Sequence, residues 1–66
     1  MKKIKFADNL KKLRIENNLS QTALAEKLNV NFRTVSAWEN SICEPSLEML
    51  VKLSDLFNES IDDLIF

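Results

Sequence analysis

Apolar residues along this chain recur three and four positions apart, which places them on one face of successive α-helices. In the first such stretch, Phe6, Leu10 and Leu13 follow one another at i, i+4 and i+7. Spacing and capping residues together predict helices over residues 6–16, 21–28, 32 to about 40, 47 to about 57, and 61–65. The fourth of these carries the apolar residues Leu47, Leu50, Val51, Leu53 and Phe57. The expected fold class is therefore all-α with five helices.

Polar residues mark where these helices begin and end. The last four are each preceded by a favoured N-cap residue, whose side chain accepts a hydrogen bond from a first-turn N–H. These N-caps are Ser20, Asn31, Ser46 and Ser60, and the last resembles a capping box with Asp63. The chain has no Gly, so the left-handed residues that end helices are predicted to be Asn, which tolerates that conformation better than most. The three candidates are Asn18, Asn29 and Asn58.

The stretch over residues 21–40 carries two short helical patterns joined by a sharp corner. Its apolar pairs are Leu24 with Leu28 and Val35 with Trp38. Only residues 29–31 separate the two patterns, and the small Ala25 stands where the second helix must cross the first closely. This is the pattern of a helix-turn-helix, a structure that presents its second helix to the DNA major groove.

Composition limits the functions open to this chain. Its 66 residues allow one domain, placed over residues 1–66, with a small core. Cys43 is the single cysteine and there is no His, so neither a thiolate metal site nor a paired catalytic cysteine is expected. With no Tyr, no Gly-rich phosphate loop and no carboxylate cluster outside the helix caps, we expect no enzyme activity, no cofactor and no small-molecule site.

The apolar segments of the chain are short. None approaches the roughly 18 residues that cross a membrane, and the N-terminal lysines are not followed by a signal-peptide pattern. A cytoplasmic protein that does not contact the membrane is therefore expected.

Charge is unevenly distributed along the sequence, although its net value is only −1. Residues 1–38 hold eight basic side chains against three acidic ones, a net charge of +5. Residues 39–66 hold seven acidic side chains against Lys52, a net charge of −6. Two opposite poles would let one side of the molecule face a phosphate backbone. A small domain with solvated charges is the alternative.

A helical wheel of the third predicted helix separates an inward face from an outward one, at about 100° per residue. Val35 and Trp38 point inward, with Asn31 and Ile42 near them. The outward residues are Arg33, Ser36, Ala37 and Asn40. A short polar face of this kind suits contact with base edges.

Arg33 is the main candidate for a base contact, because its guanidinium can donate two hydrogen bonds to guanine O6 and N7. A contact with phosphate alone is the alternative. Ser36 can donate or accept at a base edge, and Ala37 offers only apolar contact, for example to a thymine methyl. Phe32 lies between the two faces, so it either leans on the domain surface or packs against a thymine methyl.

Candidate phosphate contacts surround the two helices. Gln21 begins the second predicted helix, where amide N–H groups and the helix dipole favour an anion. Asn31, which doubles as an N-cap, is a further candidate, as are Lys27 and Asn40. A further candidate contact is a basic arm near the duplex, formed by Lys2, Lys3 and Lys5.

From Phe6 to Ile65 the sequence resembles the XRE family of helix-turn-helix domains, the Cro and lambda-repressor type. The residues that carry the resemblance are Leu10, Leu13-Arg14, Leu19-Ser20-Gln21, Leu24-Ala25-Glu26-Lys27-Leu28, Val35-Ser36, Trp38-Glu39-Asn40, Pro45-Ser46-Leu47-Glu48, Leu50, Lys52-Leu53 and Ser60-Ile61-Asp62-Asp63-Leu64. The resemblance implies a five-helix domain that binds operator DNA, often as a dimer, and regulates transcription. It also implies that Gln21 binds the DNA backbone and braces the recognition helix, and that Arg14 and Glu39 form a structural ion pair.

Three features depart from the family pattern. The family commonly has Gly after the pair matching Glu39 and Asn40, followed by basic residues that touch phosphates, whereas this chain continues with Ser41 to Glu44. Glu59 stands where an apolar residue is frequent, and Ala37 stands where a polar or basic one is frequent. The loop after the third helix therefore lacks cations, and one possible base contact is lost.

We expect sequence-specific binding of double-stranded DNA by a transcriptional regulator, a repressor that acts as a homodimer on a pseudo-palindromic operator. One domain covers only a half-site, and Ile65 and Phe66 offer a hydrophobic dimer contact, unless they form a frayed end. The alternative is a protein-interaction module of the antitoxin or antirepressor type with weak DNA affinity. The acidic C-terminal part and the loop from Ser41 to Glu44 favour that alternative.

Overall fold

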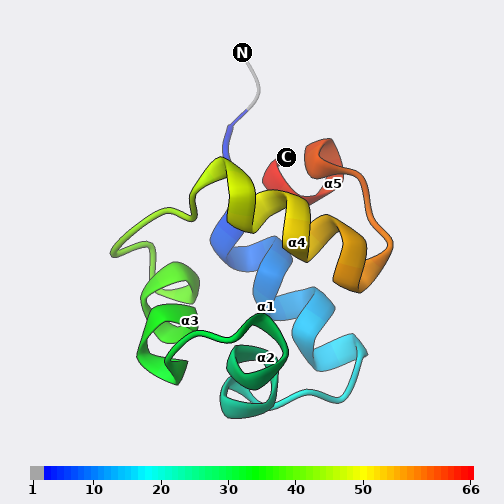
Figure 1. Cartoon of the computed structure of the whole chain (residues 1–66). Helices are drawn as coiled ribbons and strands as arrows, with labels where there is room; N and C mark the ends of the chain where they lie inside the picture. Colours follow the sequence, from blue (N-terminus) through cyan, green and yellow to red (C-terminus); the bar gives the residue numbers. More distant parts are fainter. Residues whose placement is uncertain (1–2) are drawn as a thin grey trace.

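The computed structural model describes residues 3–66 and contains five helices in the predicted order. They are α1 (Phe6–Glu16), α2 (Gln21–Leu28), α3 (Phe32–Glu39), α4 (Leu47–Phe57) and α5 (Ile61–Ile65). No strand occurs among the described residues, so the all-α prediction is confirmed. α2 packs against α3, α1 contacts both α3 and α5, and α5 also packs against α4. In Figure 1 the pair α2 and α3 occupies the lower left, and α4 and α5 lie above.

Four helices begin where their N-terminal residues predict. Ser20 Oγ accepts a first-turn N–H of α2 at 2.9 Å, and Asn31 Oδ1 accepts one of α3 at 2.8 Å. Ser46 and Ser60 cap α4 and α5 in the same way. Each bond satisfies an N–H that has no partner within its own helix, so these starts are fixed by local sequence.

The first four helices end alike, with a left-handed residue just after the helix. Asn18, Asn29 and Asn58 take φ values of 58°, 58° and 54°, as predicted, and Ser41, which was not predicted, takes 58° after α3. The residue that follows each of them donates its N–H to a carbonyl of the last helical turn. The four bonds are Leu19 N to Arg14 O, Val30 N to Ala25 O, Ile42 N to Ala37 O, and Glu59 N to Ser54 O. They satisfy carbonyl groups that the helix leaves without a partner.

Each of the five helices contributes one fully buried side chain to the core. These residues are Leu10, Leu24, Val35, Leu53 and Leu64. Ala25, predicted to stand at the close crossing of two helices, is buried in the same core. Phe6 and Trp38 pack edge to face with ring centroids 6.3 Å apart, a favourable geometry that joins the start of α1 to α3.

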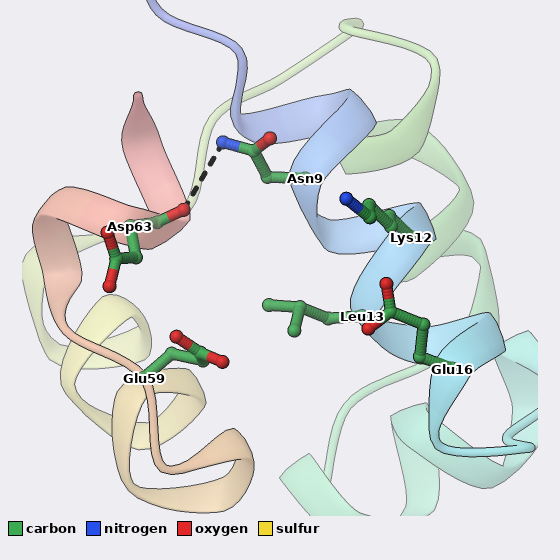
Figure 2. Close-up of a pocket in the computed structure, with 6 residues that line it drawn as sticks. All are labelled: Asn9, Lys12, Leu13, Glu16, Glu59 and Asp63. Carbon is green, nitrogen blue, oxygen red and sulfur yellow. Dashed lines mark hydrogen bonds between the residues drawn. The ribbon is translucent and has the colours of Figure 1, made fainter.

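Hydrogen bonds hold the short α5 against α1. The Asn9 side chain donates to the Leu64 carbonyl at 3.1 Å and to the Asp63 carbonyl at 3.3 Å, the second of which is drawn in Figure 2. The Lys5 N–H donates to the Ile65 carbonyl at 2.6 Å. A helix of five residues has too few internal bonds to persist alone, so its position depends on these contacts and on the buried Leu64.

The prediction that Ile42 lies near the inward face of the third helix is wrong, because the residue is 77% exposed. α3 has already ended at this point, and the left-handed turn at Ser41 redirects the chain, so the helical rotation no longer applies.

On α4, Leu50 and Leu53 are buried, whereas Leu47 is 82% exposed despite belonging to the apolar pattern. The spacing located α4 and both of its buried residues, but it also included exposed ones.

The Glu39 carboxylate at the end of α3 accepts hydrogen bonds from two other helices. Arg14 on α1 donates from Nε to Glu39 Oε2 at 2.6 Å and from Nη2 to Oε1 at 3.0 Å. Gln21 at the start of α2 donates from Nε2 to the same Oε1 at 3.2 Å. Arg14 also donates from Nη1 to the Leu19 carbonyl at 2.9 Å. We call these four residues the Glu39 network.

The Glu39 network lies inside the fold. The side chains of Arg14 and Glu39 are only 12% and 4% exposed, and among the described residues no buried side-chain nitrogen or oxygen lacks a partner. The hydrogen bonds to Glu39 raise the pKa of the Arg14 guanidinium above its ordinary value, against a smaller lowering by burial. Bidentate bonds of this kind are geometrically specific, so the network fixes α3 relative to α1 and α2.

Removing one partner of this ion pair is expected to cost far more than removing an exposed charge. Arg14→Ala strands the buried Glu39 carboxylate, and we expect the free energy of unfolding to fall by roughly 3–5 kcal/mol. Urea unfolding followed by circular dichroism measures this loss. Lys11→Ala, which removes an exposed cation from the same helix, is the matched control. Similar losses in the two variants would show that the network does not hold the fold.

Ser41 is the one residue among the described positive-φ positions that is not Asn. A side chain in the left-handed conformation costs about 1–2 kcal/mol relative to Gly, and the extra freedom of Gly in the unfolded chain offsets part of the gain. We therefore expect Ser41→Gly to raise the free energy of unfolding by about 0.5–1 kcal/mol. Cys43→Gly, in the same loop, should lower it instead. Thermal unfolding of the two variants and the parent measures both changes. A Ser41→Gly protein no more stable than the parent would contradict the prediction.

Candidate nucleic-acid interface

The side of α3 that faces away from the core forms a continuous surface. We call it the α3 ridge, and its residues are Phe32, Arg33, Ser36, Ala37 and Asn40. The first two and the last are exposed, and the other two are half-buried. In Figure 1, α3 stands at the left edge of the molecule with no other helix outside it. The α3 ridge is therefore open to a partner.

Arg33 lies in the first turn of α3 with its side-chain donors unused. Its guanidinium carbon is 5.8 Å from the centroid of the Phe32 ring, and Phe32 is 47% exposed. Stacking of this kind uses the face of the guanidinium and leaves the N–H groups at its edge available. The Arg33 side chain donates no hydrogen bond to any other residue in the described range. The stack thus keeps the group on the ridge without occupying its donors.

Ser36 and Asn40 are bonded to one another across one helical turn. Asn40 Nδ2 donates to the Ser36 carbonyl at 2.8 Å and to Ser36 Oγ at 3.3 Å. Asn40, a candidate for phosphate contact, therefore already uses its amide nitrogen within the α3 ridge. Sequence reasoning missed this pair, although residues four apart on a helix are neighbours and their spacing was a usable signal.

Gln21 and Asn31, two further candidates for phosphate contact, stand at helix N-termini. Gln21 is half-buried and its amide nitrogen is bonded to Glu39, while its backbone N–H belongs to the first turn of α2, where helices lack internal acceptors. Asn31 is exposed and spends its side-chain oxygen on the cap of α3. Both positions combine unpaired N–H groups with the positive end of a helix dipole, which favours an anion.

Lys27, the remaining candidate for phosphate contact, is exposed near the end of α2. It lines a depression together with Lys52, Asp55 and Leu56 of α4. The structure therefore groups Lys27 with α4 rather than with the residues of the α3 ridge.

Lysines of the N-terminal segment also lie beside acidic residues. Lys3 and Lys5 line a depression with Asp62 and Asp63 of α5, while Lys2 lies outside the described residues. In Figure 1 this segment is at the top of the molecule, away from α2 and α3 at the lower left. The described part of the basic arm therefore lies away from the α3 ridge.

A third group of opposite charges lies between α1 and the C-terminal part of the chain. Lys12 on α1 lines a depression of about 190 Å³ with Glu59 and Asp63, which lie on its other side in Figure 2. Folding thus places some of the basic residues of the N-terminal part beside acidic residues of the C-terminal part, and the two opposite charge poles stay a prediction. Arg33 is the only basic residue of α3.

Two observations limit the other chemistry of this fold. No helix in the described residues is long and apolar enough to cross a membrane. Within residues 3–66, no three His, Cys, Asp or Glu side chains are grouped so that they could hold a metal ion. The α3 ridge offers hydrogen-bond donors and apolar surface instead.

Comparison with known proteins connects this arrangement to a family. Residues 10–64 match the Helix-turn-helix family. The chain is 37% identical over 62 residues to the HTH-type transcriptional activator BcrR of Enterococcus faecalis, a match that covers 94% of this chain and 30% of that protein.

Two solved structures share the fold. The crystal structure of a transcriptional regulator from Listeria innocua matches with a TM-score of 0.91 and 38% identity, over 97% of this chain and 60% of that one. Hydroxypropylphosphonic acid epoxidase from S. wedmorenis matches with a TM-score of 0.84 and 34% identity, over 92% of this chain and 32% of the enzyme. The chain thus spans less than two thirds of the length of each of these three proteins.

The matched range runs from the middle of α1 almost to the end of α5. It includes the whole unit of α2, turn and α3, together with the helices that support it. The resemblance expected from the sequence is therefore confirmed, and the chain belongs to the XRE type of the helix-turn-helix family.

Proposed function

We propose that this chain is the DNA-binding domain of a transcriptional regulator and that it binds double-stranded DNA in a sequence-specific manner. The observation that supports this most is the exposed α3 ridge, on a helix fixed from behind by the Glu39 network. A helix of this kind fits the major groove of B-DNA. The names of relatives such as BcrR agree with a role in transcription, which would place the protein with DNA in the cytoplasm.

Within this proposal, the side chains of α3 make the base contacts. Arg33 donates two hydrogen bonds to guanine O6 and N7, a pairing worth roughly 1–3 kcal/mol of discrimination. Ser36 bonds to a neighbouring base edge, and Phe32 and Ala37 contact thymine methyl groups. The Glu39 network supports these contacts indirectly, because it sets the angle at which α3 stands on the domain.

The phosphate contacts are proposed for Gln21, Asn31, Lys27 and Asn40. The first two have the stronger support, because each combines an amide side chain with a helix N-terminus. Asn40 would have to release a hydrogen bond to Ser36 before it could bind phosphate. Lys27 would contact DNA only where the backbone passes the α4 side of the domain.

We further propose a homodimer on a pseudo-palindromic operator. One α3 covers a single half-site, and two-fold symmetry places the second recognition helix about one helical turn, roughly 34 Å, along the DNA. Ile65 is half-buried and Phe66 is exposed at the end of α5, so the two supply apolar surface for a self-complementary contact.

The proposed direction of regulation is repression. A dimer that occupies its operator blocks other proteins from the same DNA, and this requires no contact beyond DNA binding. Activation requires an additional contact with the transcription machinery. The relative BcrR is named an activator, so the direction of regulation needs a test of its own. If this protein represses, a reporter gene placed behind the selected operator is expressed less with the protein than without it.

A second candidate function is a protein-interaction module of the antitoxin or antirepressor type with weak DNA affinity. The observation in its favour is the shortage of cations on α3, whose one basic residue is Arg33, and the acid that the loop from Ser41 to Glu44 adds. Binding of random duplexes at low salt distinguishes the two candidates. A protein that binds no duplex under these conditions would contradict the DNA-binding proposal and favour the module.

Two substitutions separate base contact from phosphate contact. Arg33→Ala should relax the preference at one base pair, with a loss of about 1–3 kcal/mol of discrimination. Gln21→Ala should weaken all sequences similarly and leave the slope of log K against log salt nearly unchanged, because an uncharged amide releases no counterion. Selection from a random pool and titration of the selected duplex measure both effects, with Lys11→Ala as an exposed control on α1. If Arg33→Ala lowers affinity uniformly and keeps the preference, Arg33 is a phosphate contact.

The dimer proposal predicts a difference between whole operators and half-sites. Phe66→Ala should weaken binding to an operator with two half-sites by about tenfold, because the second subunit loses part of its apolar contact. Its affinity for a single half-site should stay unchanged. Ile15→Ala, which removes an exposed apolar residue of α1, is the control. Equal operator affinity for the parent and both variants, with sedimentation showing the same oligomeric state, would exclude this contact.

A further inference from the structure

We infer that the α3 ridge is complementary to base edges that present acceptors and methyl groups, so that the DNA strand facing it carries guanine and thymine. This inference rests on the proposed DNA binding and adds the class of sequence that is bound. It starts from the hydrogen-bonding character of each ridge side chain in the structure.

Most of the α3 ridge cannot accept a hydrogen bond. The guanidinium of Arg33 is a donor only, and its N–H groups make no bond to another described residue. Phe32 and Ala37 offer a ring and a methyl group, which suit contact with the C5-methyl of thymine. Ser36 is the one base-facing residue that could act either as donor or as acceptor.

Asn40 biases the Ser36 hydroxyl towards donation. Asn40 Nδ2 donates to Ser36 Oγ at 3.3 Å and is anchored by its 2.8 Å bond to the Ser36 carbonyl. This bond occupies one acceptor site of the hydroxyl, and the Ser36 O–H donates to no other described residue. One of the two acceptor sites of the hydroxyl is therefore used within the α3 ridge, while its proton stays available for an acceptor on a base. Asn40 acts here as a positioning residue for Ser36.

The amide oxygens at the two ends of α3 do not change this balance. Asn31 Oδ1 is occupied by the Arg33 N–H, which caps the helix. Asn40 Oδ1 lies just beyond the C-terminal end of α3, whereas helix-turn-helix proteins contact bases mainly with the N-terminal residues of the recognition helix.

Base edges in the major groove differ in the groups that meet such a surface. Guanine presents two acceptors, O6 and N7, and thymine presents the O4 acceptor and a methyl group. Cytosine presents an exocyclic amine donor, and adenine presents an amine donor beside a single acceptor, N7. An amine would meet the Arg33 guanidinium donor to donor, and it would find one of the two acceptor sites of Ser36 already used. A donor left without an acceptor in a desolvated contact is costly, so these bases are disfavoured on the facing strand.

The experiment replaces one base pair and one single atom in the duplex obtained by selection from a random pool. Thymine at the base pair affected by Ser36→Ala is replaced by 5-methylcytosine, which keeps the methyl group and exchanges the O4 acceptor on the facing strand for an amine donor, while guanine replaces adenine on the other strand. We expect about a tenfold loss of affinity for this duplex. We also expect a loss of similar size when 7-deazaguanine removes the N7 acceptor at the base pair affected by Arg33→Ala.

The role of Asn40 is tested by comparing the affinity for the thymine duplex with the affinity for the 5-methylcytosine duplex. Asn40→Ala frees the Ser36 hydroxyl to accept from an amine, so the ratio of thymine-duplex to 5-methylcytosine-duplex affinity should fall from about ten to below three. A purely structural role would lower both affinities and leave the ratio unchanged. Asn17→Ala is the matched control, because Asn17 makes the same bond to a carbonyl four residues earlier, at 2.7 Å, on α1.

The outcomes separate this inference from the function on which it rests. Selected half-sites in which one and the same strand carries guanine or thymine at both base pairs, those affected by Arg33→Ala and by Ser36→Ala, support it, together with a ratio that falls only in Asn40→Ala. Selected half-sites in which neither strand does so, or a ratio unchanged in Asn40→Ala, overturn it and leave sequence-specific binding intact. A pool from which no sequence is enriched overturns the proposed function itself.

Discussion

The orientation of α3 depends on one buried carboxylate. Glu39 accepts hydrogen bonds from Arg14 on α1 and from Gln21 at the start of α2, so three helices meet at its two oxygen atoms. Apolar side chains can pack at a range of helix angles, whereas bonds to both carboxylate oxygens fix distance and direction together. The α3 ridge on the surface therefore owes its position to a group that would not itself contact DNA.

Much of the fold could be predicted from sequence because its determinants act over short distances. Ser20 and Asn31 cap helices through bonds to residues two or three positions away, and Asn29 ends α2 by its own backbone conformation. The ion pair between Arg14 and Glu39 is different, since its partners are 25 residues apart. No spacing rule indicates that contact, and only the family resemblance suggested it.

The features that sequence reasoning missed arise where separate segments come together or where a helix ends. Lys12 and Glu59 border one depression because α5 folds onto α1, a neighbourhood that charge counted along the sequence does not indicate. Ile42 is exposed because the turn at Ser41 ends the helical repeat. The outward positions of α3 were predictable from periodicity, but the bond between Asn40 and Ser36 required side-chain coordinates.

The placement of lysines beside the chain's own carboxylates affects how such a domain would search a genome. Non-specific affinity for DNA comes almost entirely from cations that displace condensed counterions. Lysines that share a depression with acidic residues attract phosphates less than lysines on a uniformly basic surface would, which lowers the affinity for unrelated sequences. For a domain with one short recognition helix, weak non-specific binding raises the ratio of specific to non-specific affinity.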